Sequence, residues 1–185
     1  MLIGETKRAV DALGLGGRSV LVAVSGGLDS NALAHALLEI AGEKSLKLSI
    51  GHVNHGLRGD ESEADQQAVS QLADRLGMPA FSRRVEPEQL RAGRSSRERP
   101  TLQEAARTLR YRALREMAVE GSCQHVATAH NANDQAETVL LRVFRGSGPD
   151  PRNTRNRTVS AWSFALWAVA MCWQLPSAAI SRRAR

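Results

Sequence analysis

The sequence SGGLDS at residues 25–30 is the part of this 185-residue chain that most clearly predicts chemistry. It follows an apolar run at 20–24 and opens a helical pattern at 28–41. A strand that turns directly into a helix exposes unpaired backbone N–H groups and the positive end of the helix dipole at one point. Such a point binds phosphate groups, so the arrangement predicts a phosphate-binding loop.

The residue types within this loop fit the same chemistry. Gly26 and Gly27 let the chain bend tightly and let an anion approach without a Cβ in its way. Ser25 and Ser30 add hydroxyl donors. Asp29 would repel a phosphate unless a divalent cation lay between them, because hard cations bind carboxylate and phosphate oxygens together. No lysine follows the glycines as in the GxxxxGK[ST] loop. The alternative is a Gly-Gly turn whose Ser or Asp caps the helix.

A second polar cluster follows the second predicted strand. His52, Asn54, His55 and Arg58 could contact a nucleotide or a polynucleotide. The alternative is a solvated turn closed by glycines. His52 and His55 could also bind zinc together with His130, although no carboxylate or thiol at ligand spacing supports a metal site.

Charged residues on two later helical segments are further candidates. Asp134 and Glu137 are either a helix start or metal-binding or base carboxylates that face the loop. Arg107 and Arg110 lie on the polar side of their helix, where arginines are either solvated or in contact with phosphate or RNA. The sequence leaves both pairs of alternatives open.

The elements that must position these residues alternate between strand and helix. The predicted strands are 19–24, 46–53, 80–85 and 125–129, and the predicted helices are 5–13, 28–41, 62–76, 102–120 and 134–144. This alternation predicts an α/β fold with a doubly wound parallel sheet. Ligands of such sheets bind beyond the carboxyl ends of the strands. The polar residues at 25–30, 52–58 and 130–134 each follow a predicted strand and fall at that edge.

Local signals give more detail for two of the helices. Ser62 with Asp65, and Thr101 with Glu104, have the spacing of a capping box at a helix start. Residues 86–100 are polar and predict a long loop. The arginines at 83–99 make this stretch either a mobile basic lid or a disordered loop.

Charge is distributed unevenly along the chain. Residues 151–185 hold six of the 25 Lys and Arg residues, none of the 19 acidic residues and all three tryptophans. Residues 1–150 are therefore balanced in charge, and the chain changes character near residue 150. The two cysteines have no paired spacing, which favours a reducing compartment over a disulfide framework. The amino-terminal residues do not have the pattern of a signal peptide.

Four motifs carry a resemblance to a known family. The loop resembles the pyrophosphate loop of ATP-pyrophosphatases. Together with three later motifs it is similar to tRNA(Ile)-lysidine synthetases; these motifs are HVNHGLRGDES at 52–62, EAARTLRYRAL at 104–114 and AHNANDQAETVLLRVFRGSG at 129–148. The resemblance implies a Rossmann-like, adenine nucleotide alpha hydrolase-like fold and a cytoplasmic ligase. That ligase would use ATP and Mg²⁺ to adenylate the wobble cytidine of tRNA(Ile), and free lysine would then displace AMP.

The resemblance also implies roles for individual residues. Residues in contact with ATP would be Ser25, Gly26, Gly27, Leu28, Asp29, Ser30, His52 and Asn54. Catalytic residues would be Asp29, Asp134, Glu137 and His130, with Mg²⁺ held by Asp29 and Asp134. Residues in contact with the substrate tRNA would be His55, Arg58, Arg107 and Arg110.

Two departures from the family qualify this interpretation. Asn133 stands where the family usually carries a second aspartate, which removes a charge from the last motif. Beyond residue 148 the resemblance ends, so we predict a partial catalytic domain at 1–148 and an atypical tail at 149–185. The tail is either an unrelated translation product or an interfacial segment around 159–175, and no stable membrane association is expected. The sequence does not predict an oligomeric state.

Other functions fit the same loop. A tRNA thiolase or an amidating synthetase would also adenylate its substrate, although thiolation usually needs reactive cysteines. An ATP-binding fragment without turnover is the third alternative.

Overall fold

A parallel sheet forms the centre of the protein. The computed structural model describes residues 2–56, 59–92, 100–130, 169–170 and 173–174. The strands are β1 (Ser19–Ala23), β2 (Lys47–Asn54), β3 (Ala80–Arg84), β4 (His125–His130), β5 (Val169–Ala170) and β6 (Trp173–Gln174). Their order is β3-β2-β1-β4-β5, with β6 also paired to β4. The first four strands are parallel, and the two short ones pair antiparallel with β4. The predicted α/β doubly wound parallel sheet is confirmed.

The strand order contains one reversal of direction. From β1 the chain adds β2 and then β3 on one side, and it then crosses over to place β4 on the other side of β1. Val20 accordingly lies between Leu48 of β2 and His125 of β4. Loops that leave β1 and β4 diverge at such a reversal, which is where doubly wound sheets bind ligands.

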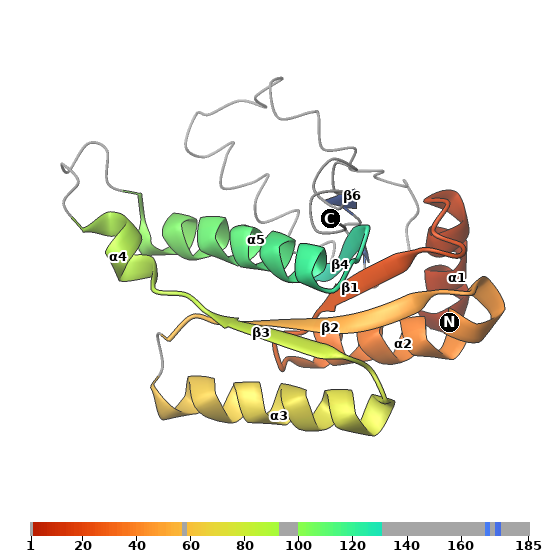
Figure 1. Ribbon diagram of the computed structural model, residues 1–185, viewed down its shortest axis with the longest axis horizontal. Coiled ribbons are helices and arrows are strands. Elements are labelled where there is room, and N and C mark those ends of the chain that lie inside the picture. The colour runs from red at the N-terminus through yellow and green to blue at the C-terminus, as the bar shows by residue number, and fades with distance from the viewer. Residues whose placement is uncertain (1, 57–58, 93–99, 131–168, 171–172, 175–185) are drawn as a thin grey trace, which may run out of the picture.

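Helices cover both faces of the sheet (Figure 1). They are α1 (Leu2–Ala12), α2 (Leu28–Lys44), α3 (Asp60–Leu76), α4 (Pro87–Arg91) and α5 (Leu102–Glu120). Helices α2 and α3 lie on one face, with α1 packed against α2, and α5 lies on the opposite face. Because helices cover both of its faces, β1 (SVLVA) is buried on both sides and is almost entirely apolar.

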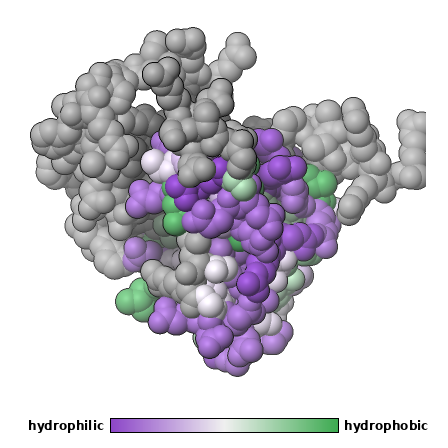
Figure 2. All heavy atoms as spheres, turned by 90° about the vertical axis from the view of Figure 1, so that its left-hand side faces the viewer, coloured by the Kyte–Doolittle hydropathy of each residue, from purple (hydrophilic) through white to green (hydrophobic). Residues whose placement is uncertain are grey.

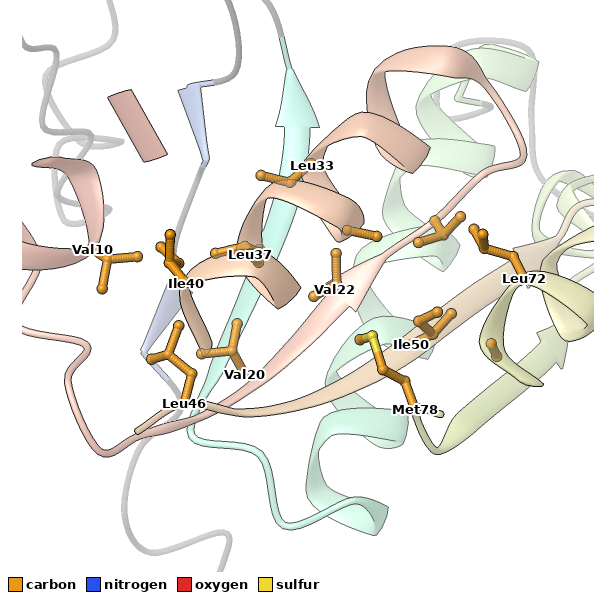
Figure 3. Packing of buried hydrophobic residues seen from close by; sticks show 14 of the residues in the cluster. Val10, Val20, Val22, Leu33, Leu37, Ile40, Leu46, Ile50, Leu72 and Met78 are labelled. Atoms are coloured by element: carbon orange, nitrogen blue, oxygen red, sulfur yellow. The ribbon is translucent and has the colours of Figure 1, made fainter. Parts of the chain in front are cut away.

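The core consists of two clusters, one on each face of the sheet. Val20 and Val22 point toward α2, where they pack with Leu37 and Ile40 (Figure 3). Leu21, between them in sequence, points to the other face and joins the α5 cluster. This alternation follows from the two-residue period of a strand. Full burial of each such side chain contributes about 1.5–3 kcal/mol to folding.

One residue of the central strands is a glycine for steric reasons. A Cβ on Gly51 of β2 would lie 2.9 Å from the Cδ2 atom of Leu21 on β1. Because that distance is shorter than carbon atoms tolerate, the Leu21 side chain occupies the space that a side chain at position 51 would need. Gly51 therefore lets β1 and β2 pair in register up to Ala23.

The two predicted capping boxes have different outcomes. At the start of α5, the Thr101 Oγ1 atom accepts a hydrogen bond from the Glu104 amide at 3.2 Å, and the Glu104 carboxylate accepts one from the Thr101 amide at 2.8 Å. The capping box predicted at Ser62 and Asp65 is wrong. Helix α3 begins two residues earlier, at Asp60, with Gly59 as its N-cap and no side-chain cap.

The predicted loop at 86–100 contains a short helix. Helix α4 has Pro87 in its first turn, a position at which the missing N–H costs nothing. The helix was not predicted because the stretch is polar and the helix is only five residues long. Of the arginines predicted to form a basic lid, those at 83, 84 and 91 form ion pairs with Glu120, Glu63 and Glu88, respectively. The arginines at 94, 97 and 99 lie outside the described residues.

Other predicted segments also lie outside the described residues. These are the helix at 134–144 and nearly all of the tail at 149–185. In the described ranges, no helix has the length and apolar character that crossing a bilayer requires.

Candidate functional site

The loop after β1 has the geometry that its sequence predicts. The Val24 amide still donates a hydrogen bond to the Gly51 carbonyl at 2.9 Å, and the chain then leaves the sheet. Gly26 has φ of +93°, a conformation that a residue with a Cβ adopts only under strain. Gly27, the N-cap of α2, is extended, and the helix begins at Leu28. The turn from strand to helix is thus completed within three residues.

The two serines of the loop hydrogen-bond within it. The Ser30 hydroxyl donates to the Gly27 carbonyl at 2.9 Å and accepts from the Ser25 amide at 3.2 Å. The Ser25 and Ser30 hydroxyl oxygens lie 3.3 Å apart, and the Gly27 amide donates to the Ser25 hydroxyl at 3.4 Å. The serines therefore fix the shape of the loop in addition to any contact with a ligand.

The first amides of α2 are available to an anion. Gly27 provides no side-chain cap, and no acceptor among the described residues meets the amides of Leu28 and Asp29. Since the first turn of a helix also carries its positive dipole end, this point attracts negative charge. Leu28 is 87% exposed, so its side chain packs little against the described residues. Its contribution to the loop is therefore its main-chain amide.

A carboxylate that the sequence did not single out lies against this loop. A Cβ on Gly26 would be 3.5 Å from the Oδ1 atom of Asp65, on the second turn of α3. Asp29, in the first turn of α2, is the other carboxylate of the loop region. From its spacing to Ser62, Asp65 was expected to belong to a capping box of α3. The sequence signal that could have indicated this role of Asp65 is the short connection from Asn54 to Asp60. So short a connection keeps the start of α3 near the end of the sheet at which the loop after β1 lies.

The end of β2 is tied to α3 through Asn54. This buried side chain donates to the Ser62 carbonyl at 3.3 Å and to the Gln66 Oε1 atom at 3.2 Å, and its Oδ1 atom accepts from the Gly56 amide at 2.9 Å. A further contact at 3.4 Å joins it to Glu63. The structure therefore gives Asn54 a local role in shaping the loop between β2 and α3. Its predicted contact with a nucleotide stays a prediction.

His52 is buried behind the loop. Its side chain is on the face of the sheet that α2 and α3 cover, as is that of Ile50, because Leu21 occupies the opposite face beside Gly51. The Nδ1 atom lies 2.9 Å from the Val24 carbonyl oxygen. Since a carbonyl only accepts, Nδ1 is the donor.

Two arginines of α5 flank Tyr111, and His55 lies close enough to Arg110 to be affected by its charge. The guanidinium groups of Arg107 and Arg110 each lie 5.3 Å from the ring centroid of Tyr111, within the range of cation–π attraction. Burial lowers the pKa of His55, and the charges of Arg110 and His52 lower it further. His55 is therefore neutral at pH 7, whereas both arginines keep their charge.

The structure places some of the predicted site residues, and others lie outside its described ranges. The structure joins His52 to Val24 at the start of the loop, ties Asn54 to α3, and places His55 near Arg110. The main chain of His130 ends β4, the neighbour of β1, as the strand order requires. Arg58, Asn133, Asp134 and Glu137 lie outside the described residues.

The edge that carries these groups is polar. Figure 2 looks onto the left-hand side of Figure 1, where the strands end, and its described atoms are mostly hydrophilic. Among the described residues, no three His, Cys, Asp or Glu side chains are grouped so that they could hold a metal ion by themselves. The alternative of a histidine zinc site therefore gains no support from this part of the chain.

Comparison with known proteins agrees with the loop and the sheet. Residues 4–157 match a protein family described as the PP-loop domain. The chain belongs to the PP-loop domain family. The matched range contains the loop at 25–30 and all four parallel strands. It also extends beyond the domain boundary predicted at 148, and that boundary stays a prediction.

Three curated relatives of this PP-loop chain illustrate the similarity. The tRNA(Ile)-lysidine synthases of Symbiobacterium thermophilum and Solibacter usitatus are 46% and 47% identical to it over 132 residues, or 71% of the chain. That of Dehalococcoides mccartyi is 35% identical over 166 residues, or 86% of the chain. The chain spans only 26%, 27% and 34% of the length of these relatives, respectively.

A solved structure shares the fold. The U34-tRNA thiolase NcsA from Methanococcus maripaludis, solved with its [4Fe-4S] cluster, has a TM-score of 0.62 and 22% identity. The alignment covers 82% of this chain and 52% of the thiolase. At this identity the likeness concerns the architecture of the PP-loop domain.

Proposed function

We propose that this chain is the ATP-binding part of a tRNA(Ile)-lysidine synthase. In the reaction that we propose, the C2 oxygen of the wobble cytidine attacks the α-phosphate of ATP, and pyrophosphate leaves. The amine of lysine then attacks C2, the C–O bond breaks, and AMP leaves with the oxygen. The observation that carries the proposal is the loop at 25–30, whose free helix amides stand at the sheet edge of a chain related to these synthases.

The loop would bind the β- and γ-phosphates of ATP, which leave together as pyrophosphate. The amides of Leu28 and Asp29 have no acceptor among the described residues, and the positive end of α2 favours the negative charge that grows on the leaving group. The serine hydroxyls keep these amides in place through the Ser30–Gly27 bond of 2.9 Å. Preorganised donors of this kind cost little reorganisation during the reaction.

The residues of the loop fit a bound Mg²⁺ ion. Mg²⁺ usually binds through one or two carboxylates together with substrate phosphates and water, and it does not need a complete protein cage. Asp29 is half-buried at the start of α2, and Asp65 lies against Gly26 from α3. Asp29 would hold the ion, with Asp134 as the second ligand by resemblance, and the ion would supply charge neutralisation at the phosphates.

The remaining predicted residues would act on the tRNA and the amine. Arg107 and Arg110 would contact RNA phosphates, and the neutral His55 beside them could accept a hydrogen bond. A free lysine amine has a pKa near 10.4, so only about 0.04% is neutral at pH 7. We propose Asp134, Glu137 and His130 to orient and deprotonate this amine, and Arg58 to contact tRNA(Ile).

The location and the alternatives follow from the same proposal. A tRNA-modifying enzyme of this kind would act in the cytoplasm without stable membrane association. A thiolase would need a reactive thiolate, but burial raises the pKa of Cys123 and keeps this thiol protonated. Among the described residues, Cys123 is therefore a poor nucleophile, which disfavours the thiolase alternative.

The deciding experiment incubates the full chain with ATP, Mg²⁺, lysine and tRNA(Ile) and follows AMP. Release that requires both lysine and tRNA(Ile) would support the proposal. Release that requires a sulfur donor or another amine would replace it with a different adenylating activity. ATP binding without any AMP release would identify an ATP-binding fragment.

A further inference from the structure

The hydrogen bond between His52 and Val24 lies at the junction between the sheet and the loop. The last pair in the β1–β2 register is Ala23 with Gly51. One residue later, the Val24 amide donates to the Gly51 carbonyl, and the Val24 carbonyl accepts from His52 Nδ1, both at 2.9 Å. Both backbone groups of Val24 are thus held by β2, and everything beyond it is loop.

The His52 ring is almost fully buried within the protein. The residue is 4% exposed and lies on the face that α2 and α3 cover. The free amides of α2, in contrast, begin beyond Gly27, after the chain has turned. The hydrogen bond from His52 holds the main chain at Val24, the residue directly before the turn.

The chemistry of the ring is fixed by its partner. Because the Val24 carbonyl can only accept, Nδ1 carries a proton. Nε2 is buried and has no hydrogen-bond partner among the described residues. Among the described residues, only Nδ1 of the ring makes a hydrogen bond. Substitutions that keep a donor at the place of one nitrogen and not the other can therefore test which nitrogen matters.

We propose that His52 is a positioning residue of the phosphate loop, which holds the Val24 carbonyl through Nδ1–H and does not touch the nucleotide. The inference rests on the proposed function only in that the loop binds ATP. It replaces the direct ATP contact that the sequence predicts for His52. Loss of the Nδ1 donor would let the peptide after Val24 rotate, and the amides that follow Gly26 would lose their common direction.

Two substitutions separate the two nitrogens. The amide nitrogen of Asn occupies the place of Nδ1, whereas that of Gln occupies the place of Nε2. We expect His52→Asn to bind Mg·ATP within about threefold of the unchanged chain, and His52→Gln to bind about tenfold more weakly, as loss of one hydrogen bond of about 1–1.5 kcal/mol implies. The same pair of changes at His35, an exposed residue of α2, is the matched control.

The readout is equilibrium binding of Mg·ATP by calorimetry, which needs neither tRNA nor lysine. If the unchanged chain does not bind ATP, the proposed function fails. If it binds and both His52 variants bind equally well, the positioning role is wrong. If His52→Asn loses binding while His52→Gln keeps it, Nε2 contacts the nucleotide and the inference is overturned.

A spectroscopic measurement on the unchanged chain covers the case in which a variant does not fold. Nitrogen NMR of the histidine rings should show His52 with its proton on Nδ1 both before and after Mg·ATP is added. A proton on Nε2, or a change of tautomer on addition of Mg·ATP, would contradict the proposal.

Discussion

Asp65 of α3 touches the phosphate loop at Gly26, where its Oδ1 atom would lie 3.5 Å from an added Cβ. A carboxylate at this place repels a phosphate that binds the same loop, and the repulsion falls when a divalent cation lies between them. The pair therefore links the shape of the loop to the Mg²⁺ ion that we propose for it.

Removal of the Asp65 charge should change how ATP binding depends on Mg²⁺. We expect Asp65→Asn to tighten binding of metal-free ATP about two- to fivefold, because one nearby negative charge is lost. Binding of Mg·ATP should improve less or become weaker. Calorimetric titrations with and without Mg²⁺ would measure both, with Asp74→Asn on the last turn of α3 as the control. Equal changes with and without Mg²⁺ would contradict this link.

Gly26→Ala should impair the loop without unfolding the sheet. With φ of +93° at this position, a Cβ introduces strain of about 1–3 kcal/mol. We expect ATP binding to weaken at least tenfold while the far-ultraviolet circular dichroism spectrum stays unchanged. Gly42→Ala in α2, where a Cβ meets nothing within 4 Å, should instead stabilise the chain by about 0.5–1 kcal/mol. Unimpaired ATP binding by Gly26→Ala would show that the turn is not required.

Asp29→Ala should abolish Mg²⁺-dependent use of ATP. The residue is in the first turn of α2, and its removal takes away the proposed carboxylate ligand from the phosphate site. Release of AMP in the presence of tRNA(Ile) and lysine is the measurement, and Glu39→Ala, at an exposed position of the same helix, is the control. Unchanged AMP release would refute the role that we assign to Asp29.

The start of α5 depends on its capping box. Thr101→Ala removes the acceptor of the Glu104 amide, and we expect the free energy of unfolding to fall by about 0.5–2 kcal/mol. Urea denaturation followed by circular dichroism would measure the change. Thr108→Ala, within the same helix, should have little effect, since its hydroxyl bonds only to the Glu104 carbonyl. Equal effects of the two substitutions would argue against the cap.

Stability should fall as the pH falls through the range in which histidine titrates. The folded state lowers the pKa of His55 by burial and by the charges of Arg110 and His52, and it lowers that of His125 by burial and by Arg18. The unfolded chain therefore binds more protons, so this contribution is complete above pH 6.5 and is lost below it.

Urea unfolding at several pH values would measure this effect. We expect His55→Asn to flatten the dependence of the unfolding free energy on pH between 6.5 and the lower pKa of the folded state. The unchanged chain, measured over the same pH range, is the reference. An unaltered slope in the His55 variant would remove this assignment.

Much of the fold could be predicted because local and long-range signals agree. The four parallel strands were expected within two residues of their observed ends. The clearest of them is β1, an apolar run that ends at the glycine turn. The Thr101–Glu104 cap was identified for the same reason: its partners are three residues apart. The start of α3 was not, because Gly59 begins that helix by its backbone conformation and offers no side-chain signal.

The candidate site was predictable in its loop and less so around it. The apolar run at 20–24, the glycines at 26 and 27 and the helical pattern from 28 predict a strand, a turn and a helix start in that order. Asp65 was missed because its approach to Gly26 depends on how α3 returns across the sheet. The bond from His52 to Val24 joins residues 28 positions apart and could not be read from spacing along the chain.

The absence of a side chain at position 51 has a consequence for how this protein tolerates change. Leu21 closes the gap between two neighbouring strands only because Gly51 leaves room for it. Any larger residue there would push apart the strand that leads into the loop and the strand that carries His52. A substitution deep in the hydrophobic interior would then behave like a substitution of a ligand-binding residue, and screens for lost ATP binding should recover it beside those of the loop itself.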